Sequence, residues 1–346
     1  MKAAGSSLFW WFGPIFVFGF LPPLDTLIGK DSCNPPDGIA AALERDGYYR
    51  WCVYLFLPLQ LAALVWACAE WSSGALSALD YLGLAATIGV VGGVGINTAH
   101  ELGHKSEKVE RWLSKITLAQ TGYGHFYVEH NRGHHVRVAT PEDPASSRLG
   151  ESFWAFLPRS VAGSLASAWE IEKSRLRRKG KPALSIENDA VNAWAMTAVL
   201  YGVLLAVFGM SILPWLLVQA VLGFSLLEAV NYLEHYGLAR QKRPGGRYEP
   251  CAPRHSWNSD NVVSNVLLYH LQRHSDHHAW PSRRYQALRS FDEAPELPSG
   301  YGTMVVIALV TPLWRRIMDP KVIAHYGGNP ALANVHPSKR KKYGLD

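Results

Sequence analysis

Histidine clusters are the feature of this sequence most able to do chemistry, because eight of its 14 histidines fall into three short stretches. The first stretch pairs two imidazoles four residues apart, and the other two each place one histidine a turn before a histidine pair. Positions three and four apart share a helix face, and a neutral imidazole is the commonest metal ligand of proteins. The predicted ligands are His100, His104, His130, His134, His135, His274, His277 and His278.

Further polar residues lie within or beside these clusters. His235 is a candidate ninth ligand. His270 is expected one turn before His274 on the same helix, either as a further ligand or, by preference, as a hydrogen-bond donor behind the ligands. Metal-bound histidines usually donate their second ring N–H to a carboxylate or another acceptor. The residues expected to orient the ligands and balance the charge of the metal are Glu101, Asp143, Asn231, Glu234 and Asp276.

The composition of the site limits the choice of metal. A nitrogen-rich site without thiolates suits zinc, copper, nickel or iron. The four cysteines form no C-x-x-C pair, which argues against a zinc ribbon or a built-in rubredoxin-like iron site. Eight or nine imidazoles divided between two ions leave four or five for each ion, with room for dioxygen. Iron fits that arrangement best among the redox-capable metals.

Two other functions use similar residues. His100-Glu101-x-x-His104 matches the zinc-peptidase signature, but one tetrahedral zinc cannot use the remaining histidines. A metal transporter or sensor would place its site near the bilayer midplane, whereas these histidines begin where the apolar segments end. The net charge of +6 could suggest nucleic acid, but the apolar segments indicate a membrane protein instead.

Five apolar segments precede or separate the clusters. A spanning helix needs about 20 apolar residues. The sequence therefore predicts an all-α integral membrane bundle of about five spans, with a helical cap that carries the histidines, in a single domain over residues 1–346. The segment at 301–314 is too short to span. The expected spans are residues 7–24, 51–69, 81–99, 191–209 and 212–230.

The order of these spans predicts where the clusters lie. Because the fourth and fifth spans form a hairpin, segments 100–190 and 231–346 are expected on the same side of the membrane. Of 34 Lys and Arg residues, 30 follow His100, and positive residues collect on the cytoplasmic side. The histidines are therefore expected in the cytoplasm. The charge run Glu170–Lys181 predicts a solvated helix near lipid headgroups, or alternatively a docking patch for an electron donor.

The residues around the histidines resemble the sequence motifs of one family. The motifs that carry the resemblance are His100-Glu-Leu-Gly-His-Lys105, Glu129-His-Asn-Arg-Gly-His-His135 with Val138-Ala-Thr-Pro-Glu-Asp-Pro144, Asn231-Tyr-Leu-Glu-His-Tyr-Gly237, and Leu271-Gln-Arg-His-Ser-Asp-His-His-Ala279 through Tyr285-Gln-Ala-Leu-Arg289. They look like those of the integral-membrane alkane 1-monooxygenases, within the membrane desaturase/hydroxylase superfamily. The likeness runs from about Phe16 to Gly328. Members typically have six spans, so this chain is expected to start near the second.

This resemblance implies terminal hydroxylation of alkanes to 1-alkanols at a non-haem di-iron centre, in a bacterial inner membrane. It also implies O₂ as co-substrate, and rubredoxin with its reductase as the source of two electrons. The nine histidines named above would be the iron ligands. An acyl-lipid desaturase or another hydroxylase of the superfamily is the alternative.

The expected substrate agrees with the chemistry of the clusters. An unactivated C–H bond has no acidic proton and no leaving group, so acid–base and nucleophilic catalysis cannot break it. An alkane offers only apolar surface for recognition, at about 0.8 kcal/mol per buried CH₂. We therefore expect an apolar slot between helices that opens to membrane lipid, with Val17 and nearby aromatic residues of the first span in its lining.

Overall fold

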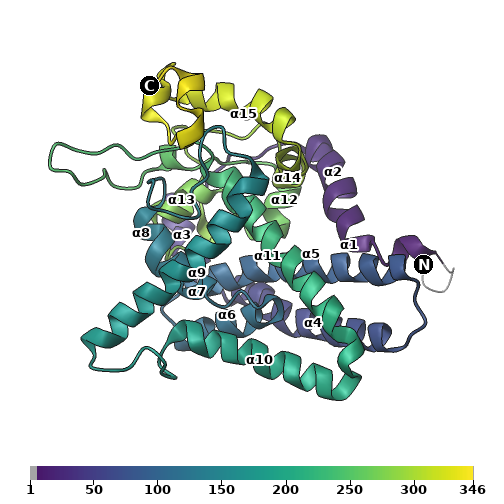
Figure 1. Cartoon of the computed structure of the whole chain (residues 1–346). Helices are drawn as coiled ribbons and strands as arrows, with labels where there is room; N and C mark the ends of the chain where they lie inside the picture. Colours follow the sequence, from purple (N-terminus) through teal and green to yellow (C-terminus); the bar gives the residue numbers. More distant parts are fainter. Residues whose placement is uncertain (1–5, 346) are drawn as a thin grey trace. The chain divides into compact units, whose positions relative to one another are not determined.

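The computed structural model describes residues 6–345, and no β-strand forms within that range beyond isolated bridges. The predicted all-α fold is therefore confirmed. Figure 1 shows the helices, which are α1 (Phe12–Pro14), α2 (Leu21–Ile28), α3 (Asp37–Arg45), α4 (Gly47–Ser72), α5 (Ala78–Gly103), α6 (Lys108–Leu118), α7 (Phe126–Glu129), α8 (His135–Arg137), α9 (Phe153–Arg178), α10 (Asp189–Phe208), α11 (Leu213–His235), α12 (Val262–Leu267), α13 (His274–Ala279), α14 (Tyr301–Leu309) and α15 (Thr311–His325).

Within residues 6–345, four helices are long and apolar enough to cross a membrane: Gly47–Ser72, Ala78–Gly103, Asp189–Phe208 and Met210–His235. They contain or closely match four of the predicted spans. The first predicted span, residues 7–24, is an apolar helix over Phe12–Ile28 that is shorter than the other four. A 3₁₀ turn at Ser7–Phe9 precedes this helix instead of extending it. The protein is therefore a helical membrane protein with four long spans and one shorter apolar helix.

The chain divides into two compact units by its internal contacts. The first comprises Met1–Leu21, Arg45–Asn131 and Ala168–Leu227, and the second comprises Pro22–Glu44, Arg132–Ser167 and Glu228–Asp346. The chain crosses between the units inside helices, including α9 and α11. The single domain expected from the sequence remains a prediction.

In the first unit, α5 packs against its neighbours through glycines. A Cβ atom on Gly89 would lie 2.8 Å from the Cβ of Leu222, and one on Gly93 would lie 2.8 Å from Leu226 Cδ2. Small residues let membrane helices approach closely. The glycines of α5 are therefore points of close contact between helices. This packing fixes the helix that ends at the first histidine cluster.

Side-chain caps set where three of the spans begin. Asp46 accepts a hydrogen bond from Tyr48 N at the start of α4, and Ser77 accepts one from Asp80 N at the start of α5. Asn188 accepts from both Ala190 N and Val191 N at the start of α10. Such caps satisfy backbone N–H groups that have no partner within the helix.

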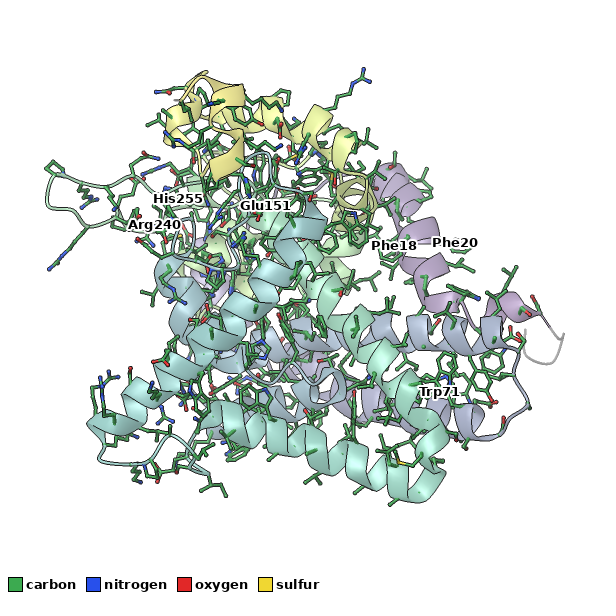
Figure 2. The ribbon with its side chains drawn as sticks, in the orientation of Figure 1. Phe18, Phe20, Trp71, Glu151, Arg240 and His255 are labelled. Atoms are coloured by element: carbon green, nitrogen blue, oxygen red, sulfur yellow. The ribbon has the colours of Figure 1, made fainter. Side chains whose placement is uncertain are left out.

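Buried side chains hold the first unit together. Trp71, near the end of α4 in Figure 2, lies in an apolar core with Leu64, Leu84 and Leu216. A polar network crosses the bundle elsewhere, where Gln219 Nε2 donates to Gln120 O at 2.8 Å. Partners for these amides are needed because water cannot satisfy them inside a membrane.

The second unit contains α12 to α15 and long loops. α14 and α15 pack against each other, and Trp314 is buried, so the segment predicted as too short to span is packed on protein. The loop after α11 is fixed at its base: Arg240 Nε donates to Glu249 O at 2.6 Å, and His255 Nε2 lies 3.1 Å from Glu249 Oε1. Figure 2 shows Arg240 and His255 at the base of this loop.

Candidate metal centre

The second unit brings four histidines together, which we call the four-histidine group: His134, His235, His274 and His278. One ring nitrogen from each lies within 4.8 Å of the others, and all four side chains are buried. His134 belongs to a π-helical turn at His130–His134, His235 ends α11, and the other two come from α13. Four histidines from three distant parts of the sequence therefore converge.

The nitrogen atoms of this group have the spacing of metal ligands. The Nε2–Nε2 distances are 3.2 Å for His134–His278, 3.2 Å for His235–His274 and 2.9 Å for His274–His278. Four imidazole nitrogens placed tetrahedrally at about 2.1 Å from one ion would lie about 3.4 Å apart, a few tenths of an ångström more than these distances. The four-histidine group therefore fits one metal ion.

Asp143 sets the tautomer of one ligand. Its Oδ2 lies 2.9 Å from His134 Nδ1 and accepts a hydrogen bond from Ser146 Oγ at 2.6 Å. Burial opposes ionisation of Asp143, yet His134 and Ser146 hold the pKa of this carboxyl below its usual value. An ionised carboxylate can only accept, so His134 carries its proton on Nδ1 and directs the Nε2 lone pair at the group.

The protonation of the group favours a metal as well. Burial, together with the neighbouring imidazoles, holds the pKa of His278 well below its usual value. A neutral imidazole is the form that binds metal. Where two Nε2 atoms about 3 Å apart are both unprotonated, their lone pairs repel each other, and a cation between them would remove that repulsion.

Glu234 supports the group from a second direction. Its Oε2 lies 3.1 Å from His274 Nε2, and Tyr301 donates a hydrogen bond to its Oε1 at 2.8 Å. Both residues are buried. Glu234 was predicted to orient a ligand because it precedes His235, and that role stays a prediction, since its contact is with the Nε2 of His274 that faces His235 and His278. Tyr301 was missed, because no sequence signal relates the first residue of α14 to a carboxylate on α11.

A second pair in the same unit joins two clusters. His135 Nε2 lies 3.1 Å from His277 Nε2, and the ring of His135 stacks on His278 at 4.3 Å between centroids. Asp276, next to His277, contacts Arg283 Nη1 at 2.5 Å and accepts from Arg289 N at 2.9 Å. This carboxylate therefore fixes the loop after α13, although it was predicted to orient a histidine.

The first unit brings together the other three predicted ligands, which we call the three-histidine group: His100, His104 and His130. Their ring centroids lie 5.1 Å apart for His100–His104, 4.5 Å for His100–His130 and 5.1 Å for His104–His130. His100 lies in the last turn of α5 and His104 follows its end. The i,i+4 spacing in the sequence predicted this shared face.

Glu101 and Lys105 form a buried ion pair beside the three-histidine group. The Lys105 Nζ lies 2.9 Å from Glu101 Oε1, and the two side chains are 2% and 8% exposed. The carboxylate thus lies against a cation of its own helix end. A general base of the zinc-peptidase type would instead need this carboxylate to face a metal-bound water.

The remaining predicted supporting residues are His270 and Asn231. His270 has a left-handed backbone with φ 53°, and α13 begins only at His274, so the expectation that His270 extends that helix was wrong. Its backbone N donates to Asn265 O at 2.7 Å, and burial lowers its pKa to about 4. Asn231 is buried within α11, one turn before His235.

Comparison with known proteins identifies relatives of this chain. Residues 76–308 match the family model described as fatty acid desaturase. An alkane 1-monooxygenase of Acinetobacter baylyi is 50% identical over 330 residues, which cover 95% of this chain and 81% of that protein. An alkane 1-monooxygenase of Alcanivorax borkumensis is 44% identical over 335 residues, covering 96% and 83%.

A more distant relative is the xylene/toluene monooxygenase hydroxylase component XylM of Pseudomonas putida, which is 26% identical over 318 residues, covering 90% of this chain and 82% of that protein. The match to the family model places the chain in a superfamily of membrane oxidoreductases. The chain belongs to the alkane hydroxylase family of the membrane desaturase/hydroxylase superfamily. The resemblance seen in its histidine motifs is thereby confirmed.

Proposed function

We propose that this protein hydroxylates the terminal carbon of alkanes to give 1-alkanols, with O₂ as co-substrate. The observation that carries the proposal is the convergence of four buried Nε2 atoms in a protein with four apolar spans. Relatives that are 40% to 50% identical over nearly the whole chain bear the name alkane 1-monooxygenase. A metal site beside the membrane suits a substrate that dissolves in lipid.

We further propose that nine histidines hold two iron ions. The four-histidine group supplies one set, and the remaining five are the three-histidine group with His135 and His277. Iron, when bound, supplies the activation of O₂ with two electrons, so that one oxygen enters the alcohol and the other enters water. The chain's own contribution is to fix the ring nitrogens, through contacts such as Asp143 with His134, and to exclude water.

The electrons in this proposal come from rubredoxin, a separate chain, and its reductase. No pair of cysteines in this sequence could hold a rubredoxin-like iron, because Cys33, Cys52, Cys68 and Cys251 are far apart in sequence and all are free thiols. The site is proposed to face the cytoplasm of a bacterial inner membrane, where such soluble carriers are found. The uneven distribution of Lys and Arg supports this orientation.

Product analysis tests the proposed function. Cells that express the protein with a rubredoxin and its reductase are fed a ladder of alkanes, and the products are identified by mass spectrometry. We expect 1-alkanols, and none from a His274→Ala variant. New double bonds in lipid acyl chains without 1-alkanols would instead show the desaturase chemistry after which the family model is named.

Metal analysis of the purified protein tests the centre separately. Two irons per chain are expected, and a variant that removes one ligand of the four-histidine group should lose one ion before the other. A single zinc per chain would contradict the di-iron proposal even if 1-alkanols were found.

A further inference from the structure

The turn between α9 and α10 combines exposed cations with exposed apolar side chains. Arg177, Arg178 and Lys179 are all exposed at the end of α9. Shortly after them, the side chains of Leu184 and Ile186 are 77% and 87% exposed. Figure 1 shows this turn at the free ends of the two helices. Large apolar side chains this exposed need a partner that is itself apolar.

Hydrogen bonds hold the turn in this shape. Asn188 Nδ2 donates to Ala183 O at 2.9 Å, and Asp189 N donates to Glu172 Oε2 at 2.7 Å. Arg175 joins both sides of the turn, donating to Glu172 Oε2 at 2.6 Å and to Glu187 O at 2.5 Å. The exposure of the two apolar residues is thus a property of a fixed loop.

The three cations differ from their charged neighbours. Arg175 is paired with Glu172, and Lys181 is paired with Glu187. Arg177, Arg178 and Lys179 make no ion pair with any residue between 6 and 345. Three adjacent positive charges therefore face outward without an ion pair. Lys179 lies within electrostatic range of Glu187, but that carboxylate is already paired with Lys181.

An apolar groove begins at the same turn. Its volume is about 830 Å³, and its lining comes from the turn and from α4, α6 and α10. Leu184 and Ile186 line it at the turn, and Val191 and Val203 mark its extent along α10. Twelve residues of helix rise about 18 Å. One leaflet of a bilayer is about 15 Å of hydrocarbon, so the groove has the length of one acyl chain.

The turn end of the groove has the character of a membrane surface. The spanning helix α10 starts at Asp189, directly after the turn. Trp112, which also lines the groove, is 49% exposed and has Lys115 Nζ 3.8 Å from its ring centroid. Tryptophan with a nearby cation is typical of the boundary between hydrocarbon and headgroups. The cations at the turn would then lie at the level of lipid phosphates.

We propose that this groove is a binding site for one anionic phospholipid. An acyl chain lies in the groove along α10, and Arg177, Arg178 and Lys179 bind the phosphate of a headgroup that has no positive charge of its own to balance it. The exposed side chains of Leu184 and Ile186 cover the part of the acyl chain nearest the headgroup. A zwitterionic lipid would fill the groove equally well but would gain less from the three cations, so the site selects by headgroup charge.

Lipid retention tests this proposal on the full chain. The protein is purified from membranes containing equal amounts of phosphatidylglycerol and phosphatidylethanolamine, and the lipids that remain bound are counted by native mass spectrometry. Each Lys or Arg near an anionic lipid surface contributes roughly a fivefold preference. Replacing Arg177, Arg178 and Lys179 together by Gln should therefore lower the preference for phosphatidylglycerol at least tenfold.

A control for charge uses the loop after α11. Lys242, Arg243 and Arg247 are also exposed, and their triple replacement by Gln removes the same charge without touching the turn. This variant should keep the preference for phosphatidylglycerol. An equal loss in both triple variants would mean that overall charge sets the preference, and would overturn the proposal.

A second pair of variants tests the groove. Ala195 lines it, whereas Ala198, also exposed on α10, does not. Ala195→Trp should displace the retained lipid, and Ala198→Trp should not. Thermal unfolding of both variants shows whether each is folded. Retention of phosphatidylglycerol by folded Ala195→Trp protein would overturn the proposal, as would a change in the alkane lengths hydroxylated with lipid retention unaltered, because the groove would then be a path for substrate.

Discussion

Replacement of Asp143 by Asn should weaken metal binding although it changes only one atom. In the native chain, Asp143 Oδ2 faces His134 Nδ1 at 2.9 Å, and Asp143 Oδ1 accepts from Ala145 N at 3.2 Å. An amide has one oxygen and one NH₂ group. If its oxygen faces His134, its NH₂ group faces the Ala145 N–H. If its NH₂ group faces His134, the imidazole must move its proton to Nε2, which can then no longer bind metal.

The amide orientation with its oxygen towards His134 is the less damaging, because His134 then keeps its proton on Nδ1, and this orientation sets the size of the effect. Loss of a carboxylate behind a metal-bound histidine typically costs tenfold to 100-fold in affinity, which corresponds to roughly 1.4 to 2.8 kcal/mol. Asp143 is buried, so solvent cannot replace its charge. We therefore expect Asp143→Asn to lie within this range, and Asp143→Ala to lie at its upper end or beyond.

The assay is competition for iron between the protein and a chelator of known affinity, with metal content measured after equilibration. Ser146→Ala serves as the matched control, because it removes the hydrogen bond of 2.6 Å to the same oxygen while it keeps the charge. This variant should lose less than tenfold in affinity. If Asp143→Asn binds iron as tightly as the native protein, the carboxylate does not set the tautomer of His134 and the reasoning fails.

Three further predictions rest on other parts of the fold. Burial lowers the pKa of His125 to about 4. Below pH 6.5 the unfolded chain therefore binds a proton that the folded chain does not, and the stability of the fold falls as the pH drops from 6.5 to 4. His125→Gln should lessen that fall by about 1.4 kcal/mol per pH unit, measured as a smaller loss of Tm. Gly89→Ala should destabilise the bundle by about 1–3 kcal/mol because its Cβ would lie 2.8 Å from Leu222 Cβ, whereas Gly202→Ala, with nothing within 4 Å, should not lower Tm. Tyr301→Phe leaves a buried carboxyl oxygen on α11 without its donor at 2.8 Å, and chemical denaturation should show a loss of about 1–3 kcal/mol; an unchanged midpoint would mean that another donor replaces the hydroxyl.

Spacing in the sequence predicted the parts of the site that one helix determines. His274 and His278 are four residues apart, and their Nε2 atoms lie 2.9 Å apart on α13. His100 and His104 share the end of α5 in the same way. Local periodicity was sufficient in both cases, because a helix fixes the direction of residues one turn apart.

The remainder of the site depends on backbone geometry that periodicity does not report. His130–His134 forms a π-helical turn, which has a wider spacing than an α-helix. Tyr269 and His270 both have φ 53°, so the chain turns sharply just where a regular helix was expected. His270 is one of the residue types that adopt this conformation more often than most, but Tyr269 is not. Such positions are imposed by surrounding structure, and the sequence pattern therefore could not show them.

The carboxylates divide into two kinds that the sequence could not separate. Asp143 and Glu234 face ring nitrogens of the four-histidine group, at 2.9 and 3.1 Å. Asp276 lies in the middle of the last cluster, yet it contacts Arg283 and Arg289. On α13 the three histidines share one face of the helix, so Asp276, which lies between them in the sequence, points away from that face. The acid between the histidines of α13 is therefore turned away from the ligands. Asp143 and Glu234 reach ligands of the group because the fold brings other segments in from a different direction.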